Sequence, residues 1–182
     1  LRDRTLSDIV AATKHGALAL GEAELLALAM ERARTSNEDW SFAAIEFPPL
    51  LRDAILEKAQ RTRNESERAN LLGWLEVHGV PRAALLDLAL EAIRAGRMSV
   101  GLQSWLSRQL TTRAAWDKHG QIIVSALVGQ RAFAEASELV TIAWSEAGRG
   151  GNEPPRGLLE AMQVAFALAL LDLARATLTR GD

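Results

Sequence analysis

The chain has 182 residues, a formal net charge of −2 at pH 7, 48% apolar residues and 24% charged residues, which fits one soluble globular domain. It contains 32 Ala and 29 Leu but no Cys and no Tyr, a composition that favours helices and excludes disulfides and Cys-ligated metal sites. The 18 Arg and 3 Lys are scattered among 23 acidic residues, so no basic surface indicates a nucleic-acid partner.

Turn and cap signals predict helices along almost the whole chain. The first helix is expected to begin at Thr5 or Ser7 and to run toward Lys14. Ser36 and Asp39 resemble a capping box that opens a short helical segment around Trp40. The further helices are expected over 22–34, 50–61, 64–78, 82–95, 99–110, 132–147 and 156–179, with another that begins at Thr111 or Thr112 and reaches Val128.

The predicted helices are expected to form a single all-helical domain over 1–182, as a fragment of a larger protein. Residues 148–155, Gly-Arg-Gly-Gly-Asn-Glu-Pro-Pro, are predicted to be a flexible loop between the last two helices. Asn64, with Glu67 three residues later, is expected to cap one helix, and Gly79 is expected to end it.

The last predicted helix is apolar on all sides over 164–171. A helix that is apolar on two faces requires neighbours on both sides, as in a stacked array or an oligomer interface. A homo-oligomer through 156–179 is therefore one expected partner arrangement. The uncharged stretch 161–171 is shorter than the ~20 residues that cross a bilayer, so no membrane span is expected within this segment.

Two segments resemble the helix–turn–helix unit of tetratricopeptide repeats. The first, 71–95, combines a Leu-Gly pair, a turn glycine and small residues on the following helix, at Leu72, Gly73, Gly79, Ala84, Leu88 and Ala92. The second, 124–147, repeats the turn and the second helix, with Phe133, Ala136, Val140 and Ala143. The resemblance implies antiparallel helical hairpins stacked as a short α-solenoid.

An irregular helical bundle is the alternative fold. The turn glycines Gly21, Gly79 and Gly129 are 58 and 50 residues apart, whereas the repeat family has a period of about 34 residues. Both folds are all-α.

The three histidines precede glycines, at His15, His78 and His119. A histidine before a glycine at a helix end satisfies the last carbonyl groups of the helix, and this interpretation suits His78. At the other two positions the glycine is expected to mark a close helix crossing. No His is spaced for a metal site, so no metal, cofactor or catalytic residue is predicted.

Charged side chains of the middle helices are expected to form a solvated surface. Glu65 and Glu67 lie near Lys58 and Arg68 in the sequence, and mixed charges of this kind usually pair at the surface of a helix.

The sequence thus predicts a non-enzymatic protein-interaction or scaffold module of tetratricopeptide-like repeats, within a larger bacterial assembly or a multidomain protein. The expected partner is another protein or a peptide. Trp40 stands in a polar segment, where it is either an exposed contact residue or part of the core. A helical ligand-binding or dimerisation domain of a regulatory protein is the alternative. The predicted partner-binding residues are Arg94, Arg97, Arg108, Arg113, Arg131 and Trp40.

Overall fold

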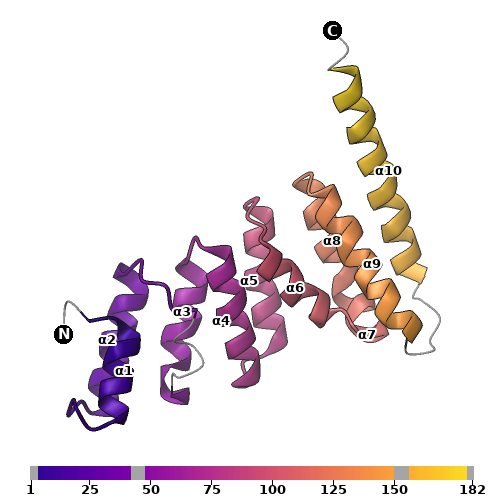
Figure 1. Cartoon of the computed structure of the whole chain (residues 1–182). Coiled ribbons are helices and arrows are strands. Elements are labelled where there is room, and N and C mark those ends of the chain that lie inside the picture. Colours follow the sequence, from indigo (N-terminus) through magenta and orange to yellow (C-terminus); the bar gives the residue numbers. More distant parts are fainter. Residues whose placement is uncertain (1–3, 42–47, 150–155, 180–182) are drawn as a thin grey trace. The chain divides into compact units, whose positions relative to one another are not determined.

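Figure 1 shows the computed structural model, which describes residues 4–41, 48–149 and 156–179. Every regular element in these ranges is a helix, as the composition predicts. Packing contacts divide the chain into two compact units. Unit 1 contains Leu1–Leu88 and Ser99–Leu102, and unit 2 contains Ala89–Met98 and Gln103–Asp182. The single domain expected over 1–182 stays a prediction.

Unit 1 is built from helices that follow one another along the chain. They are α1 (Leu6–Lys14), α2 (Glu22–Thr35), the 3₁₀ helix η2 (Pro49–Leu51), α3 (Arg52–Arg61), α4 (Glu65–Val77) and the first part of α5 (Arg82–Arg94). Helix α2 packs against α1 and α3, and α3 packs against α4. The side chains that are removed completely from solvent include Leu6, Ile9, Leu51, Ile55, Leu71, Leu72 and Leu75.

Local sequence sets the helix ends of unit 1. The Thr5 hydroxyl accepts a hydrogen bond from Asp8 N at 3.1 Å, and Asp8 Oδ2 accepts one from Thr5 N at 3.2 Å. The side chain of Asn64 accepts two backbone N–H groups in the first turn of α4. Gly79 follows α4 with a φ of +81°, which glycine adopts without steric cost. These observations confirm the predicted caps.

Residues 36–41 form turns in place of the short helical segment predicted around Trp40. The Ser36 hydroxyl accepts from Glu38 N at 3.0 Å, and Asp39 Oδ1 accepts from Ser41 N at 2.8 Å. Such bonds between a side chain and the backbone two residues later compete with helix formation. The remainder of the predicted segment, residues 42–47, lies outside the described residues.

Unit 2 contains the longest helices. Its elements are the end of α5, most of α6 (Val100–Gln109), α7 (Arg113–Ala115), the π-helical turn η3 (Trp116–Gly120), α8 (Gln121–Gly129), α9 (Phe133–Arg149) and α10 (Arg156–Leu178). Helices α8, α9 and α10 pack against one another, and η3 contacts α7, α8 and α10. Helix α9 continues through the first residues of the predicted loop, and 150–155 lie outside the described residues.

The π-helical turn η3 packs the ring of Trp116 against Gly120. A Cβ atom at Gly120 would lie 2.5 Å from the ring of Trp116, which is 3% exposed. Glycine at this position therefore leaves room for the indole of the same helical turn. The predicted helix from Thr112 onward is confirmed as a continuous helical run, with this turn inside it.

The glycine after His15 does not mark a helix crossing. His15 and His78 are the C-cap residues of α1 and α4. Gly16 has a φ of +70°, and no atom lies within 4 Å of the position of its Cβ. Gly16 therefore ends a helix, and the close crossing expected there is wrong. Gly120 lies inside a helix, and the three atoms nearest to the position of its Cβ all belong to Trp116.

Candidate functional site

Helix α10 exposes most of its apolar side chains. Ala161 and Ala165 are buried, and they lie on the side of the helix that packs in unit 2. The large apolar side chains that remain between 42% and 74% exposed are Leu159, Val164, Phe166, Leu170, Leu171, Leu173 and Leu178. Together they form the α10 surface. A contiguous apolar surface of this kind is typical of an interaction site.

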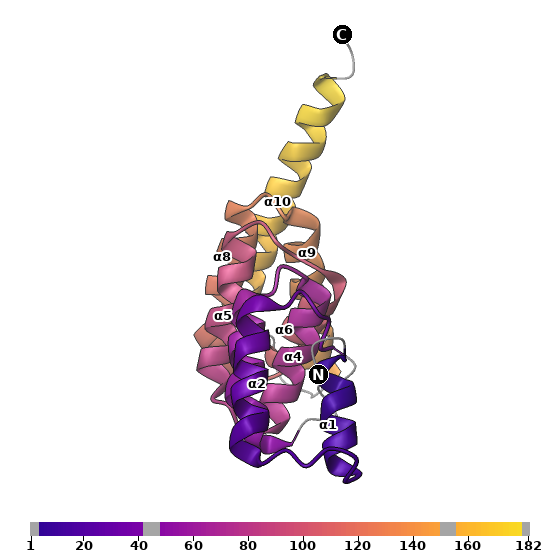
Figure 2. The same ribbon diagram turned by 90° about the vertical axis from the view of Figure 1, so that its left-hand side faces the viewer.

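The second half of α10 has no neighbour in the described part of unit 2. Every residue from Leu170 to Thr179 is exposed, and α10 extends past α8 and α9 in both views (Figure 1 and Figure 2). An isolated helix of this length is only marginally stable in water, because most helix stability comes from packing. The exposed half therefore lacks the contacts that would stabilise it.

The composition of α10 is also that of a membrane-spanning helix. Leu159–Leu178 has a mean hydropathy of 1.5 and is 11% buried. Glu160, Asp172 and Arg175 lie within this stretch, and a charge is costly at the centre of a bilayer. Length and composition alone therefore allow a span, and its expected absence stays a prediction.

A groove lies beside the first half of α10. It has a volume of about 380 Å³ and is lined by Gln121, Val124, Ser125, Val128, Gly129, Gly157, Glu160, Ala161 and Val164. The lining comes from α8 and α10, and it is mainly apolar, with Gln121, Ser125 and Glu160 as its polar residues. That combination is typical of small-molecule sites.

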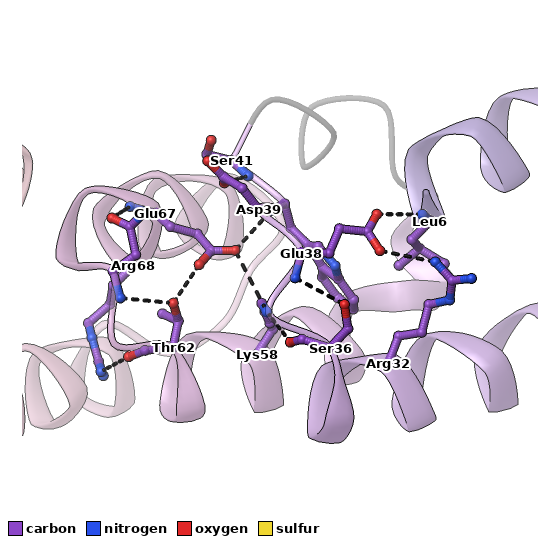
Figure 3. A network of polar contacts seen from close by, with 12 residues as sticks. Leu6, Arg32, Ser36, Glu38, Asp39, Ser41, Lys58, Thr62, Glu67 and Arg68 are labelled. Carbon is purple, nitrogen blue, oxygen red and sulfur yellow. Dashed lines mark hydrogen bonds and ion pairs between the residues drawn. The ribbon is translucent and has the colours of Figure 1, made fainter. Parts of the chain in front are cut away.

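A second cleft, of about 400 Å³, lies in unit 1 and is polar. It is lined by Ala33, Arg34, Ser36, Asn37, Asp39, Lys58, Arg61, Thr62, Arg63, Asn64 and Glu67. Figure 3 shows the polar contacts beside it, which link the 36–41 turns to α2, α3 and α4.

Glu67 and Lys58 are the centre of these polar contacts. Both residues are 3% exposed. Glu67 accepts hydrogen bonds from Trp40 N at 2.8 Å and from the Thr62 hydroxyl, and its Oε1 lies 4.0 Å from Lys58 Nζ. Lys58 donates to the Ser36 carbonyl at 2.9 Å and lies 5.7 Å from the Trp40 ring centroid. The solvated surface expected for these charges is wrong, because the 36–41 turns cover them.

The neighbouring charges of unit 1 also form pairs. Arg68 is fully buried, and its Nε lies 2.8 Å from Glu65 Oε2. Glu38 joins α1 to α2, because it accepts from Leu6 N and from Arg32 Nη1 (Figure 3). Because these charged side chains pair with groups inside unit 1, we assign their polar contacts a structural role.

Two carboxylates of unit 1 have lowered pKa values. The hydrogen bond from Arg34 to Glu57, 2.8 Å long, is the main cause that lowers the pKa of Glu57 and raises that of Arg34. Arg61, with its Nε 3.3 Å from the same carboxylate, lowers the pKa of Glu57 further. The hydroxyl of Thr5 lowers the pKa of Asp8 in the α1 cap. Each of these groups is paired with a neighbour inside unit 1, so we assign them a structural role as well.

The predicted arginines all belong to unit 2, and their grouping at one site stays a prediction. Arg94 lies at the end of α5, where its carbonyl accepts from Gln130 Nε2 at 2.9 Å. Arg131 lies beside Gln130 in the turn before α9, with a φ of +59°. Arg97, in the α5–α6 connection, is half-buried. Contacts thus bring the chain near Arg94 and Arg131 together.

The remaining two arginines lie at the other end of α6. Arg108, in its last turn, donates to the Ser104 hydroxyl at 3.3 Å. Arg113 begins α7, and its Nε lies 3.7 Å from Asp117 Oδ2. Arg113 therefore has a local acidic partner.

Trp40 belongs to the core. Its side chain is fully buried, and its backbone N–H donates to Glu67. The exposed position that a contact residue would need is therefore wrong, and the core alternative holds.

The sequence pointed to α10 through its apolar character but not to the buried charges of unit 1. The spacing of Asn64 and Glu67 predicted the cap of α4, and no local signal shows that the Glu67 side chain turns to Lys58. No group of three or more metal-ligating side chains occurs in the part of the chain that the structure describes. Comparison with protein families, with characterised proteins and with solved structures finds no match to the chain.

Proposed function

We propose that the chain is a non-enzymatic interaction module of tetratricopeptide-like helical hairpins that binds another protein chain through the α10 surface. The exposure of the apolar side chains of α10 carries this proposal. Leu170, Leu171 and Leu173 are 57% to 65% exposed. Covering a large apolar side chain completely is worth about 1.5 to 3 kcal/mol, so a partner that covers these and Leu178 gains on the order of 5 kcal/mol.

The hairpin of α8 and α9 supports a repeat-like arrangement. The two helices pack together, and Gln130 to Ala132 form the connection between them. On α9 the small residues Ala136 and Ala143 are buried, as expected where helices approach closely. We propose that such hairpins form the scaffold that presents α10.

The test is photo-crosslinking from α10 in the full chain. A benzophenone amino acid replaces Leu170, and in a control chain it replaces Gln60, an exposed residue of α3. Expressed in the source cells, the Leu170 chain should give a protein adduct that the Gln60 chain does not give. Circular dichroism checks that both chains keep their helix content.

Absence of an α10-specific protein adduct would overturn the proposed function. Adducts with lipid in place of protein would also overturn it, because they would show that α10 lies in or on a membrane.

The groove between α8 and α10 favours ligand binding as a second candidate function. Val124, Val128 and Val164 give it apolar walls. The fluorescence of 1-anilinonaphthalene-8-sulfonate should fall with Val128→Glu if the groove binds apolar ligands, and it should change little with Leu170→Glu, which lies outside the groove. The reverse pattern would show that the dye binds the α10 surface and would count against this candidate.

A further inference from the structure

We propose that the occupant of the α10 surface is the α10 helix of a second copy of this chain, packed antiparallel. The inference rests on the proposed function and names its partner. Three observations carry it: the distribution of buried and exposed residues around α10, the positions of its charges, and the projection of its second half beyond unit 2.

The buried and exposed residues lie on opposite sides of α10. At 100° per residue, Ala161 and Ala165 lie on the side that is packed in unit 2. Gln163, Ala167 and Leu170 lie on the opposite side and are exposed. Ala174 continues this exposed side one turn further along the helix. Small residues at 167 and 174 allow a second helix to approach closely.

The charges of α10 are complementary in an antiparallel pair. Glu160 and Arg175 each lie 7.5 residues from the midpoint between Ala167 and Leu168, which is about 11 Å at 1.5 Å per residue. An antiparallel pair centred there brings Glu160 of each copy level with Arg175 of the other along the axis. Both residues lie on the same flank of the pair, about 60° and 120° from the middle of the exposed side, so the long Arg175 side chain reaches the partner from the edge of the interface. Both side chains are exposed, and no ion pair joins either one to another residue of the described chain. A parallel pair would place like charges side by side.

Asp172 does not oppose this arrangement. It lies on the same side of the helix as Ala161 and Ala165, eleven residues after Ala161 and seven after Ala165. Its carboxylate therefore faces away from the partner helix and stays in water, because Asp172 is exposed in the described chain.

The second half of α10 projects beyond unit 2 and leaves room for the α10 helix of a second copy. In the antiparallel pair the exposed second half of each helix lies on the solvent side of the first half of the other. Leu170 and Leu171 of one copy then cover Val164 and Phe166 of the other. The large apolar side chains of the α10 surface supply the apolar area that each copy contributes to the pair.

The absence of cysteine from the chain permits a direct test of this geometry. Ala167→Cys places a thiol next to the proposed two-fold axis, so two copies should form a disulfide under mild oxidation. Ala174→Cys is the matched control, because it lies on the same exposed side but about 20 Å from its counterpart along the antiparallel pair. We expect the Ala167→Cys chain to crosslink at least tenfold faster than the Ala174→Cys chain. Equal rates, or no crosslink in either chain, would overturn the antiparallel dimer.

Charge reversal tests the same pairing without a crosslink. Glu160→Arg alone, or Arg175→Glu alone, places like charges at both ends of the pair and should raise the dimer dissociation constant at least tenfold in sedimentation experiments at low salt. The double variant restores two opposite-charge pairs and should return it to within about threefold of the original. A double variant no better than the single ones would overturn the proposed contact.

The outcomes separate this inference from the proposed function. If the chain sediments as a monomer at all concentrations while Leu170 photo-crosslinks to a different protein, the second copy is wrong and the interaction module stands. If Leu170 gives no protein adduct and Ala167→Cys gives no disulfide, both are wrong.

Discussion

The buried pair of Lys58 and Glu67 shows how single residues hold unit 1 together. A charge removed from water is costly unless a partner lies nearby. Glu67 faces the Lys58 ammonium and two hydrogen-bond donors, Trp40 N and the Thr62 hydroxyl. The carboxylate therefore connects residues 36–41, which form no helix, to α3 and α4.

Glu67→Gln should destabilise the protein strongly. The amide keeps the shape of the side chain but leaves the buried Lys58 without an anionic partner, and breaking a buried pair in this way costs about 3 to 5 kcal/mol. Asp53→Asn is the control, because Asp53 is 73% exposed in its contact with Arg52 and such a pair is worth at most about 1 kcal/mol. Urea unfolding of both variants measures the difference. Equal losses of unfolding free energy in the two variants would show that the buried Glu67 pair contributes no more to stability than an exposed pair.

The pair of Arg34 and Glu57 predicts a dependence of stability on pH. Its hydrogen bond holds the pKa of Glu57 below the ordinary value of 4.5. A carboxylate with a lower pKa in the folded state stabilises the protein above the unfolded pKa, and this contribution is lost as the pH falls through the folded pKa. Glu57→Gln should therefore be less stable than the original chain at pH 7, and the difference should vanish at acid pH.

Carbon-detected NMR titration assigns the cause of this shift. Arg34→Gln should raise the pKa of Glu57 more than Arg61→Gln does, because the Arg34 hydrogen bond is the main cause of its lowering. A larger effect of the Arg61 variant would reverse this assignment.

At the scale of elements, two helical glycines should respond oppositely to alanine. Gly120→Ala places a methyl group 2.5 Å from the Trp116 ring, and such overpacking costs about 1 to 3 kcal/mol. Gly73→Ala, inside α4, meets no atom within 4 Å, so it should stabilise the protein by about 0.5 to 1 kcal/mol through helix propensity. Thermal unfolding of both variants measures the signs, and a stabilising Gly120→Ala would show that the π-helical turn does not depend on glycine.

Helix starts and ends were predictable because their signals are local. The Thr5 cap, the Asn64 cap and the turn at Gly79 each depend on residues within a few positions of one another. The turns at 36–41 were missed, because Ser36 and Asp39 suit a capping box as well as they suit turns. What decides between them is distant in sequence, namely the bond from Trp40 N to Glu67.

The candidate site was predictable only in part, for the same physical reason. The apolar sequence of α10 indicated an interface, and the structure shows which of its sides is left exposed. The sequence around the arginines of unit 2 has no comparable pattern from which their grouping could be predicted. Their positions in space depend on how α5, α6 and the α8–α9 turn are arranged. Arg113, for example, has an acidic neighbour one turn away, as solvated helices commonly do.

At the scale of the whole molecule, the two units differ in how many of their charged and apolar side chains find partners inside the same unit. Unit 1 pairs its buried charges inside the unit, with Lys58 and Glu67 as the example. Unit 2 leaves the α10 surface without a neighbour among its described residues, although apolar exposure on this scale weakens a folded chain. Stability of unit 2 should therefore depend on association, whereas that of unit 1 should not.

This dependence predicts that the unfolding temperature rises with protein concentration. For a dimer, a hundredfold rise in concentration above the dissociation constant adds about 2.7 kcal/mol per dimer, which corresponds to roughly 3 to 5 °C for a chain of this length. Differential scanning calorimetry at about 1 and 100 µM measures it. The Leu170→Glu/Leu173→Glu variant, whose charges oppose burial of α10, should unfold at the same temperature at both concentrations. An original chain that also shows no dependence would mean that its folded state gains nothing from a second copy.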